Sequence, residues 1–261
     1  MNSIIQFRYI PEVVTFTFTG DMAKYDRPND ASAALNTIIA LLQDFPESLA
    51  TGTVGEQVCR LVEVHRRLRD LGVAVIAPLV ENSSDSGRAR LLAYLRNQVG
   101  RVVHTDELLI VAAITDYQRR IRELRAKFGW PIISGMAVCD MREDARLLAS
   151  PGDRIPGAMA PEEYLLLEDR CDPDAIRRWK IAGSAREVTG PLKVKLLGYL
   201  QQAVGRRVTA EELRHVAKDD AGWPAAIRGL QHEGWPIKRE AGNAAGLLPG
   251  LFILERGDRN A

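Results

Sequence analysis

Residues 91–112 read LLAYLRNQVGRVVHTDELLIVA, and residues 196–217 read LLGYLQQAVGRRVTAEELRHVA. At a fixed offset of 105 residues the two stretches are identical at 12 of 22 positions. Each stretch is followed further along by the tetrapeptide Gly-Trp-Pro-Ile. A unit that repeats in this way is expected to fold as one supersecondary module. We therefore predict two domains related by internal duplication, at residues 86–170 and 190–256.

Hydrophobic spacing within each copy predicts three helices and two strands. In the first copy the helices are expected near residues 91–99, 106–113 and 117–128, with strands at 130–134 and 164–167. The second copy predicts a helix over 192–204, one opened by the capping box Thr209-x-x-Glu212, one from Trp223, and strands at 235–239 and 251–254. Residues 140–162 of the first copy are expected to form a long loop between its two strands. Trp130 and Trp235 are expected in the core.

Residues 1–83 precede the repeats and are predicted to form a separate small α+β domain. The alternating stretch at 13–19 indicates a strand, and residues 31–42 and 54–71 have helical spacing. Gly72 is interpreted as the stop of the second helix, followed by a strand at 73–76. Between the two repeats, a short helix is expected near residues 175–180.

The composition is that of an ordinary soluble protein. Hydrophobic residues make up 46% of the chain and charged residues 26%, and the sequence has no apolar run long enough for a membrane span. The first residues do not resemble a signal peptide. Three cysteines, far apart and without a CxxC pair, favour a reducing cytoplasm and argue against a zinc site. We therefore expect a cytoplasmic protein with no membrane contact, no metal and no cofactor.

The net charge of +1 conceals an uneven distribution along the chain. Residues 86–134 carry 9 Lys/Arg against 4 Asp/Glu, and residues 190–240 carry 9 against 6. Residues 139–174 carry 4 against 10. The base-rich segments coincide with the two repeats, and local basic surface is what phosphate binding requires. The alternative is an ordinary solvated helix surface.

The pattern of three helices followed by a two-stranded wing resembles winged helix-turn-helix DNA-binding modules. The Glu-Leu-Arg at residues 123–125, the Gly-Trp-Pro-Ile at 129–132 and the strand near 164–166 are similar to modules found beside nuclease domains in bacterial restriction endonucleases. Residues 234–237 and 249–256 carry the same pattern in the second copy. The resemblance implies an α+β fold, with a small N-terminal α+β unit followed by two winged helix-turn-helix domains.

In such modules the third helix lies in the major groove, where Arg can pair with guanine and Gln with adenine. In the first copy, Tyr117, Ile121, Leu124 and Phe128 are expected to point inward. The outward or flanking residues, and thus the DNA-binding candidates, are Gln118, Arg119, Arg120, Arg122 and Arg125. Arg101 either contacts phosphate or pairs with Glu107.

The second copy has fewer basic residues on its third helix, where Ala225 and Ala226 replace Arg119 and Arg120. Its DNA-binding candidates are Arg206, Arg207, Arg228, Gln231 and Lys238. We expect this copy to contact mainly the DNA backbone, or to have acquired a protein-contact role. For Arg206, as for Arg101, the alternative to a phosphate contact is an ion pair within its own copy, here with Glu212.

No recognisable catalytic motif accompanies the repeats. None of the seven lysines follows an acidic residue at the spacing of a (D/E)xK nuclease triplet, and P-loop, GxSxG and HExxH motifs are absent. The expected function is sequence-specific binding of double-stranded DNA, as a regulator or as the target-recognition part of a restriction-type system. The expected partners are duplex DNA and either a separate catalytic subunit or a second copy bound through the N-terminal domain. The alternatives are a DNA-acting enzyme with its site in residues 1–83, or a winged-helix protein-interaction module.

Overall fold

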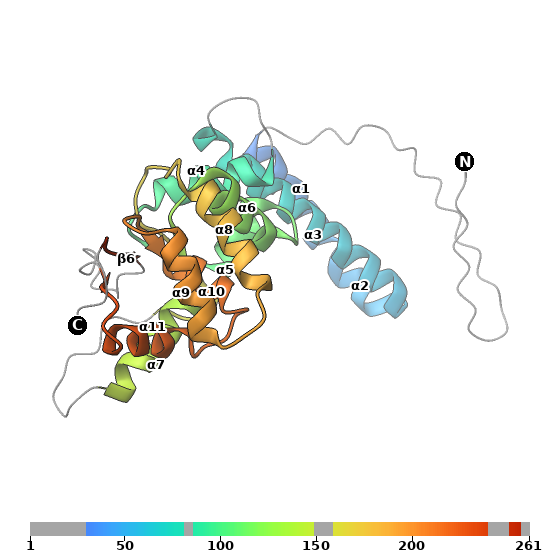
Figure 1. The fold of residues 1–261 in the computed structure, drawn as a ribbon. Helices are drawn as coiled ribbons and strands as arrows, with labels where there is room; N and C mark the ends of the chain where they lie inside the picture. The colour runs from blue at the N-terminus through green and yellow to red at the C-terminus, as the bar shows by residue number, and fades with distance from the viewer. Residues whose placement is uncertain (1–29, 81–85, 149–158, 240–250, 257–261) are drawn as a thin grey trace, which may run out of the picture.

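The computed structural model describes residues 30–80, 86–148, 159–239 and 251–256. The described elements have mixed helical and sheet character, which agrees with the predicted α+β class. Figure 1 shows a helical hairpin that projects from a larger body formed by the two repeats and the helices between them. The strand expected at 13–19 lies outside the described residues.

The projecting hairpin consists of α1 (Ala31–Gln43), α2 (Phe45–Thr51) and α3 (Val54–Ile76), followed by the 3-10 turn η1 (Ala77–Leu79). α1 runs outward, α2 forms the tip and α3 returns to the body (Figure 1). Thr53 and Glu56 form a capping box at the start of α3. The strand predicted at 73–76 is wrong, because α3 continues through Gly72. A side chain at Gly72 would meet the Ile110 carbonyl oxygen at 2.7 Å, so this glycine allows α3 to approach α5 closely.

The first module has helices α4 (Gly87–Asn97), α5 (Thr105–Ala112) and α6 (Tyr117–Phe128), and strands β1 (Val102–His104), β2 (Ile132–Ser134) and β3 (Glu163–Leu166). The strands form an antiparallel sheet in the order β1-β3-β2, in which Val103 pairs with Tyr164 and Ile133 with Leu165. The three helices and both strands of the predicted hairpin are confirmed. His104 caps α5, since its ring nitrogen accepts from the Asp106 N–H.

The second module has helices α9 (Leu192–Gln202), α10 (Ala210–Val216) and α11 (Trp223–His232), and strands β4 (Val208–Thr209), β5 (Ile237–Arg239) and β6 (Leu251–Leu254). Its sheet order, β4-β6-β5, is the counterpart of the order in the first module. The predicted capping box at the start of α10 is confirmed, with Thr209 and Glu212 each bonding to the other's backbone N–H. Both segments therefore have the same sequence of elements.

Two further helices join the modules. α7 (Gly135–Leu148) follows β2 directly, so the prediction of a loop throughout 140–162 is wrong. α8 (Ala175–Glu187) occupies the bridge and is longer than the short helix expected there. Ala137, Val138 and Met141 on α7 are buried in a core cluster that consists mainly of second-module residues. This burial, which depends on the partner surface, stabilises α7 as a helix.

The described modules share apolar packing and do not have fully separate cores. The cluster that contains Trp223 and Leu200 of the second module also includes Ile133 and Leu165 of the first. A second cluster lies within the first module, around Leu95 and Ile121. Phe128 was predicted to point inward, but it is exposed, because it lies at the end of α6 beyond the packed stripe.

Candidate nucleic-acid interface

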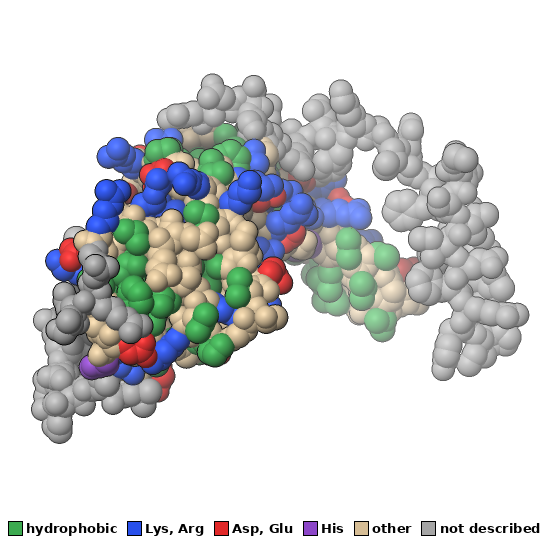
Figure 2. All heavy atoms as spheres, in the orientation of Figure 1, with side chains coloured by type: hydrophobic (Ala, Val, Ile, Leu, Met, Phe, Trp, Pro, Cys, Tyr) green, Lys and Arg blue, Asp and Glu red, His purple; other side chains and the backbone are tan. Residues whose placement is uncertain are grey.

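The third helix of the first module, α6, presents a polar face on the side opposite its buried stripe. Ile121 and Leu124 are buried in the module core, and side chains three or four residues apart share a helix face. Gln118, Arg119 and Arg122 are exposed, as their register predicts. Figure 2 shows Lys and Arg side chains gathered over the upper part of the body, where α4, α6 and α8 overlap in this view.

Glu123 organises the basic side chains at one edge of this face. Arg120 lies 2.9 Å and Arg119 3.5 Å from its carboxylate, and Arg88 of α4 lies 3.9 Å away. The hydrogen bond from Arg120 is the main cause that lowers the pKa of the Glu123 carboxyl. One anion therefore holds three cations beside the exposed face, and the local charge stays positive. Sequence reasoning missed Arg88; its place on the first turn of α4, a helix that packs on α6, is the signal that would have found it.

Arg122 and Arg101 form no ion pair with any residue that the structure describes. Arg122 is exposed in the middle of the α6 face, and Arg101 is exposed just after the end of α4. The alternative pairing of Arg101 with Glu107 is wrong, because Glu107 instead accepts hydrogen bonds from the Tyr94 hydroxyl and the His104 N–H. Both guanidinium groups are thus accessible to an anionic partner.

Arg125 was expected on or beside the outward face of α6, and this expectation is wrong. The residue is only 8% exposed. Its Nε donates to the Ile132 carbonyl at 2.7 Å, and its Nη1 lies 3.1 Å from the Glu211 carboxylate of the second module. Arg125 therefore joins the two modules, and its guanidinium is not available to DNA in this arrangement.

The basic candidates of the second module are held by acidic side chains. Arg206 lies 2.6 Å from Asp174, Arg207 lies 3.6 Å from Glu168, and Lys238 lies 2.7 Å from Glu255. Arg228 pairs with Asp144. Gln231 is exposed, but its side-chain amide donates to the Ile237 carbonyl at 2.7 Å. The alternative pairing of Arg206 with Glu212 is wrong, since Glu212 binds Arg178.

The joining helix α7 lies against α11, the third helix of the second module. Asp140 on α7 accepts from the Trp223 indole N–H at 3.0 Å and from Arg214 at 2.8 Å. Asp144, one turn further along α7, pairs with Arg228. Asp140 and Asp144 thus engage Arg214 of α10 and two polar groups of α11. The polar face of α11 is therefore less accessible than that of α6.

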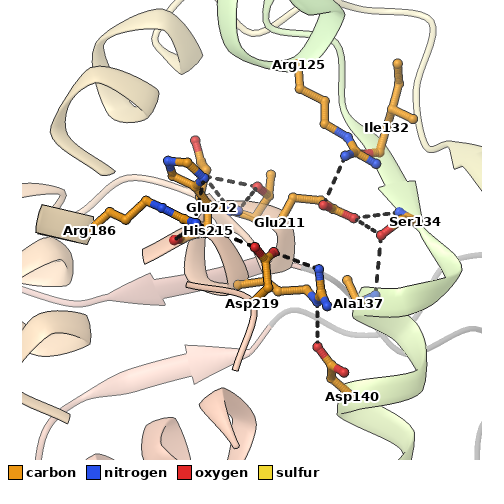
Figure 3. A network of polar contacts seen from close by, with 12 residues as sticks. Arg125, Ile132, Ser134, Ala137, Asp140, Arg186, Glu211, Glu212, His215 and Asp219 are labelled. Atoms are coloured by element: carbon orange, nitrogen blue, oxygen red, sulfur yellow. Dashed lines mark hydrogen bonds and ion pairs between the residues drawn. The ribbon is translucent and has the colours of Figure 1, made fainter. Parts of the chain in front are cut away.

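A polar network crosses the boundary between the modules (Figure 3). One oxygen of Glu211 accepts from both the N–H and the hydroxyl of Ser134 at 2.6 Å, and the other faces Arg125. Nearby, the fully buried Glu212 binds Arg178 of α8 at 3.1 Å. Burial raises the pKa of Glu212, and Arg178 opposes this effect. The network fixes the orientation of one module relative to the other.

The described residues contain no group of three or more His, Cys, Asp or Glu side chains that could hold a metal ion. A cavity of about 390 Å³ lies between the modules, and its lining includes Arg125, Arg178, Glu211 and Glu212, which pair with one another. Among the helices that the structure describes, none combines the length and apolar character needed to cross a membrane. Trp130 and Trp235 are partly buried and pack on the two cores, in agreement with their predicted role.

Comparison with known proteins identifies a family. No curated protein and no solved structure matches the chain. The model of the KpnI N-terminal domain, a restriction enzyme family, matches residues 88–167 and 193–255. These ranges cover most of the described elements of both modules and more than half of the chain. The chain therefore belongs to the KpnI N-terminal domain family.

Proposed function

We propose that this protein binds double-stranded DNA as the target-recognition part of a restriction-type system. Membership in a restriction enzyme family supports the biological setting. The three helices and antiparallel sheet of each module resemble the winged helix-turn-helix arrangement, in which the third helix enters the major groove. The proposal assigns the reading of bases to α6 of the first module.

One observation carries this assignment: the exposed face of α6 holds Gln118, Arg119 and Arg122, and Arg122 has no ion-pair partner among the described residues. An unpaired guanidinium can make a bidentate contact with guanine without first breaking a salt bridge. The corresponding Arg228 of the second module is tied to Asp144. The two modules therefore differ in which third helix is free to enter a groove.

Arg119 lies on the same face and Arg101 and Arg120 flank it. All three are assigned to phosphates, which position a protein on the duplex without reading sequence. Arg206, Arg207 and Lys238 make a smaller contribution, because each must leave an acidic partner to reach a phosphate. Arg125 is left out of the interface. The expected footprint is therefore asymmetric, with base reading concentrated under the first module.

The test begins with selection of bound duplexes from a random DNA pool, followed by anisotropy titrations of the enriched and random duplexes. Arg122→Ala should reduce the preference for the enriched duplex by roughly 10- to 100-fold, which corresponds to about 1–3 kcal/mol for one bidentate contact. Arg228→Ala, the matched control in the second module, should leave the preference unchanged. Thermal unfolding of both variants would verify that they remain folded.

Salt dependence separates phosphate contacts from base contacts. Arg101→Ala should reduce the slope of log affinity against log salt by about 0.9, with the preferred sequence unchanged. Equal losses of Arg122→Ala on enriched and random DNA would show that Arg122 contacts phosphate only. If the wild-type protein bound no duplex at low salt, the proposed function would be refuted.

A further inference from the structure

The projecting hairpin carries an apolar surface that is exposed among the residues that the structure describes. Ten large apolar side chains on α1, α2 and α3 are between 43 and 75% exposed: Leu35, Ile39, Leu42, Leu49, Val54, Val58, Leu61, Val62, Leu68 and Val75. Figure 2 shows apolar side chains grouped on the visible side of the hairpin, with few charges among them. Single exposed apolar residues are ordinary, but a contiguous patch of this size marks an interaction site.

The spacing on α3 specifies the kind of partner. Val54, Val58, Leu61, His65, Leu68, Gly72 and Val75 follow one another at alternating intervals of four and three residues. This is the heptad spacing of a helix that packs along another helix. On α1, Leu35, Ile39 and Leu42 have the same intervals and lie beside the buried contact positions Ala34 and Ile38. The surface is thus shaped to receive helices.

We propose that this surface binds a second copy of the chain, with the two α3 helices antiparallel and the twofold axis near His65. This inference is independent of the proposed DNA binding. A twofold interface requires a surface that is complementary to itself. In this register Leu61 faces Leu68 of the copy, and Val54 faces Val75. His65, at the centre of the stripe, meets its own counterpart.

The base of the hairpin completes the complementarity. Val58 of one copy comes near the base of α3 in the other, where Gly72 is buried against its own α5. Gly72 packs against Ile110 of α5, whose side chain is largely exposed and extends the apolar surface onto the body. The tip of each hairpin, with Leu49 and Val54, would therefore rest near the base of the other. A parallel arrangement would leave Ile110 uncovered and would place the two bodies side by side.

The exposed area is sufficient for a stable dimer. Ten half-exposed apolar side chains offer on the order of 800 Å² per copy, the area that each partner contributes to a standard protein interface. The hairpin projects from the body, so a second hairpin can lie along it (Figure 1). Four helices would then pack around one apolar core, as in antiparallel four-helix bundles.

Sedimentation of the full chain without DNA, over a range of concentrations, tests the proposal. The wild-type protein should sediment as a dimer, and Leu61→Glu should raise the dissociation constant roughly 100-fold or more, because both copies bury the charge at the centre of the interface. Cys59→Glu places the same charge at an exposed position on the opposite side of α3 and should leave the dimer intact. His65→Leu should tighten it. The three substituted side chains, Leu61, Cys59 and His65, are exposed, so circular dichroism should show unchanged helix content.

Disulfide cross-linking tests the orientation, in a background with the three native cysteines replaced by serine. Val54→Cys combined with Val75→Cys should give a covalent dimer on oxidation, whereas Val54→Cys alone should not. A covalent dimer from Val54→Cys alone would show parallel helices and refute the register. A wild-type chain that remains monomeric at all concentrations, or a dimer that Leu61→Glu and Cys59→Glu weaken equally, would overturn the proposal.

Discussion

Glu211 provides a direct test of how the two modules are held together. Its carboxylate and the Arg125 guanidinium are each only 9% exposed, and they lie 3.1 Å apart across the boundary. Removing one member of a buried ion pair leaves an uncompensated charge and typically costs about 3–5 kcal/mol. Glu211→Gln keeps an oxygen to accept from Ser134, so the lower end of this range, about 3 kcal/mol, is expected.

Urea unfolding, followed by circular dichroism, measures the cost as a change in the free energy of unfolding. In a thermal scan the same loss should lower the midpoint by roughly 6–12 °C, at about 2–4 °C per kcal/mol for a chain of this size. Glu233→Gln is the matched control. Glu233 pairs with Lys193 at 2.7 Å, but both side chains are 46% exposed, so its removal should cost less than about 1 kcal/mol.

A second substitution tests whether the unpaired charge of Arg125 causes the loss of stability. Arg125→Met removes the guanidinium, so adding it to Glu211→Gln should recover part of the lost stability, with a coupling energy of about 1–3 kcal/mol. If Glu211→Gln cost no more than Glu233→Gln, the buried pair would not be what joins the modules. The same conclusion would follow if the two substitutions were simply additive.

Two further predictions concern packing and titration. Gly135→Ala should be strongly destabilising, because the added carbon would lie 1.6 Å from the Ala160 carbonyl oxygen. The control, Gly198→Ala on α9, meets nothing within 4 Å and should be neutral or stabilising by about 0.5–1 kcal/mol. Thermal unfolding would distinguish the two variants, and equal effects would contradict the packing at residue 135. Burial, with a further contribution from Arg186, lowers the pKa of His215 below its ordinary value of 6.5. The unfolded chain therefore binds the proton more readily, so stability should decrease as the pH falls from about 7 to 5, and His215→Gln should flatten this dependence; an unchanged slope would refute the assignment.

The elements that the sequence predicts well are those set by residues close together in the chain. The capping box at Thr209 and Glu212 works through backbone donors within three residues, so it needs no knowledge of the fold. Gly129, with a φ of 72°, ends α6 where the sequence predicts it. The exposed position of Arg122 follows from the period of α6 once its buried stripe is known. The core of the candidate DNA-binding face was therefore predictable.

Long-range contacts determined what the sequence could not show. Gly72 has the local character of a helix stop, yet α3 continues through it because it packs on α5. Arg125 lies 86 positions before Glu211, and no periodicity within α6 predicts that pairing. Arg206 likewise meets Asp174, which belongs to the bridge between the modules. Charged side chains can be assigned to a helix face from sequence, but their partners cannot.

The difference between the two modules arises from the segments that join them, and less from the repeated stretches. Tyr94 and Glu107 of the first module recur as Tyr199 and Glu212 in the second. In the first module this pair is accessible: the Tyr94 hydroxyl donates to Glu107, and burial together with this bond raises the pKa of Tyr94 to about 12. In the second module α8 covers the pair, and its Arg178 binds Glu212.

The two joining helices therefore give the same arrangement of elements unequal surfaces. α8 packs on α9 and α10 of the second module as well as on α6 of the first, and α7 lies along α11 and supplies Asp144, which pairs with Arg228 of α11. Gln118 and Arg122 of α6 are nevertheless exposed. A twofold pairing through the hairpins would place two such α6 faces in one assembly. Each dimer would then present two copies of the proposed base-reading face, and together the two proposals predict a DNA site with two related half-sites, even though each chain alone is asymmetric.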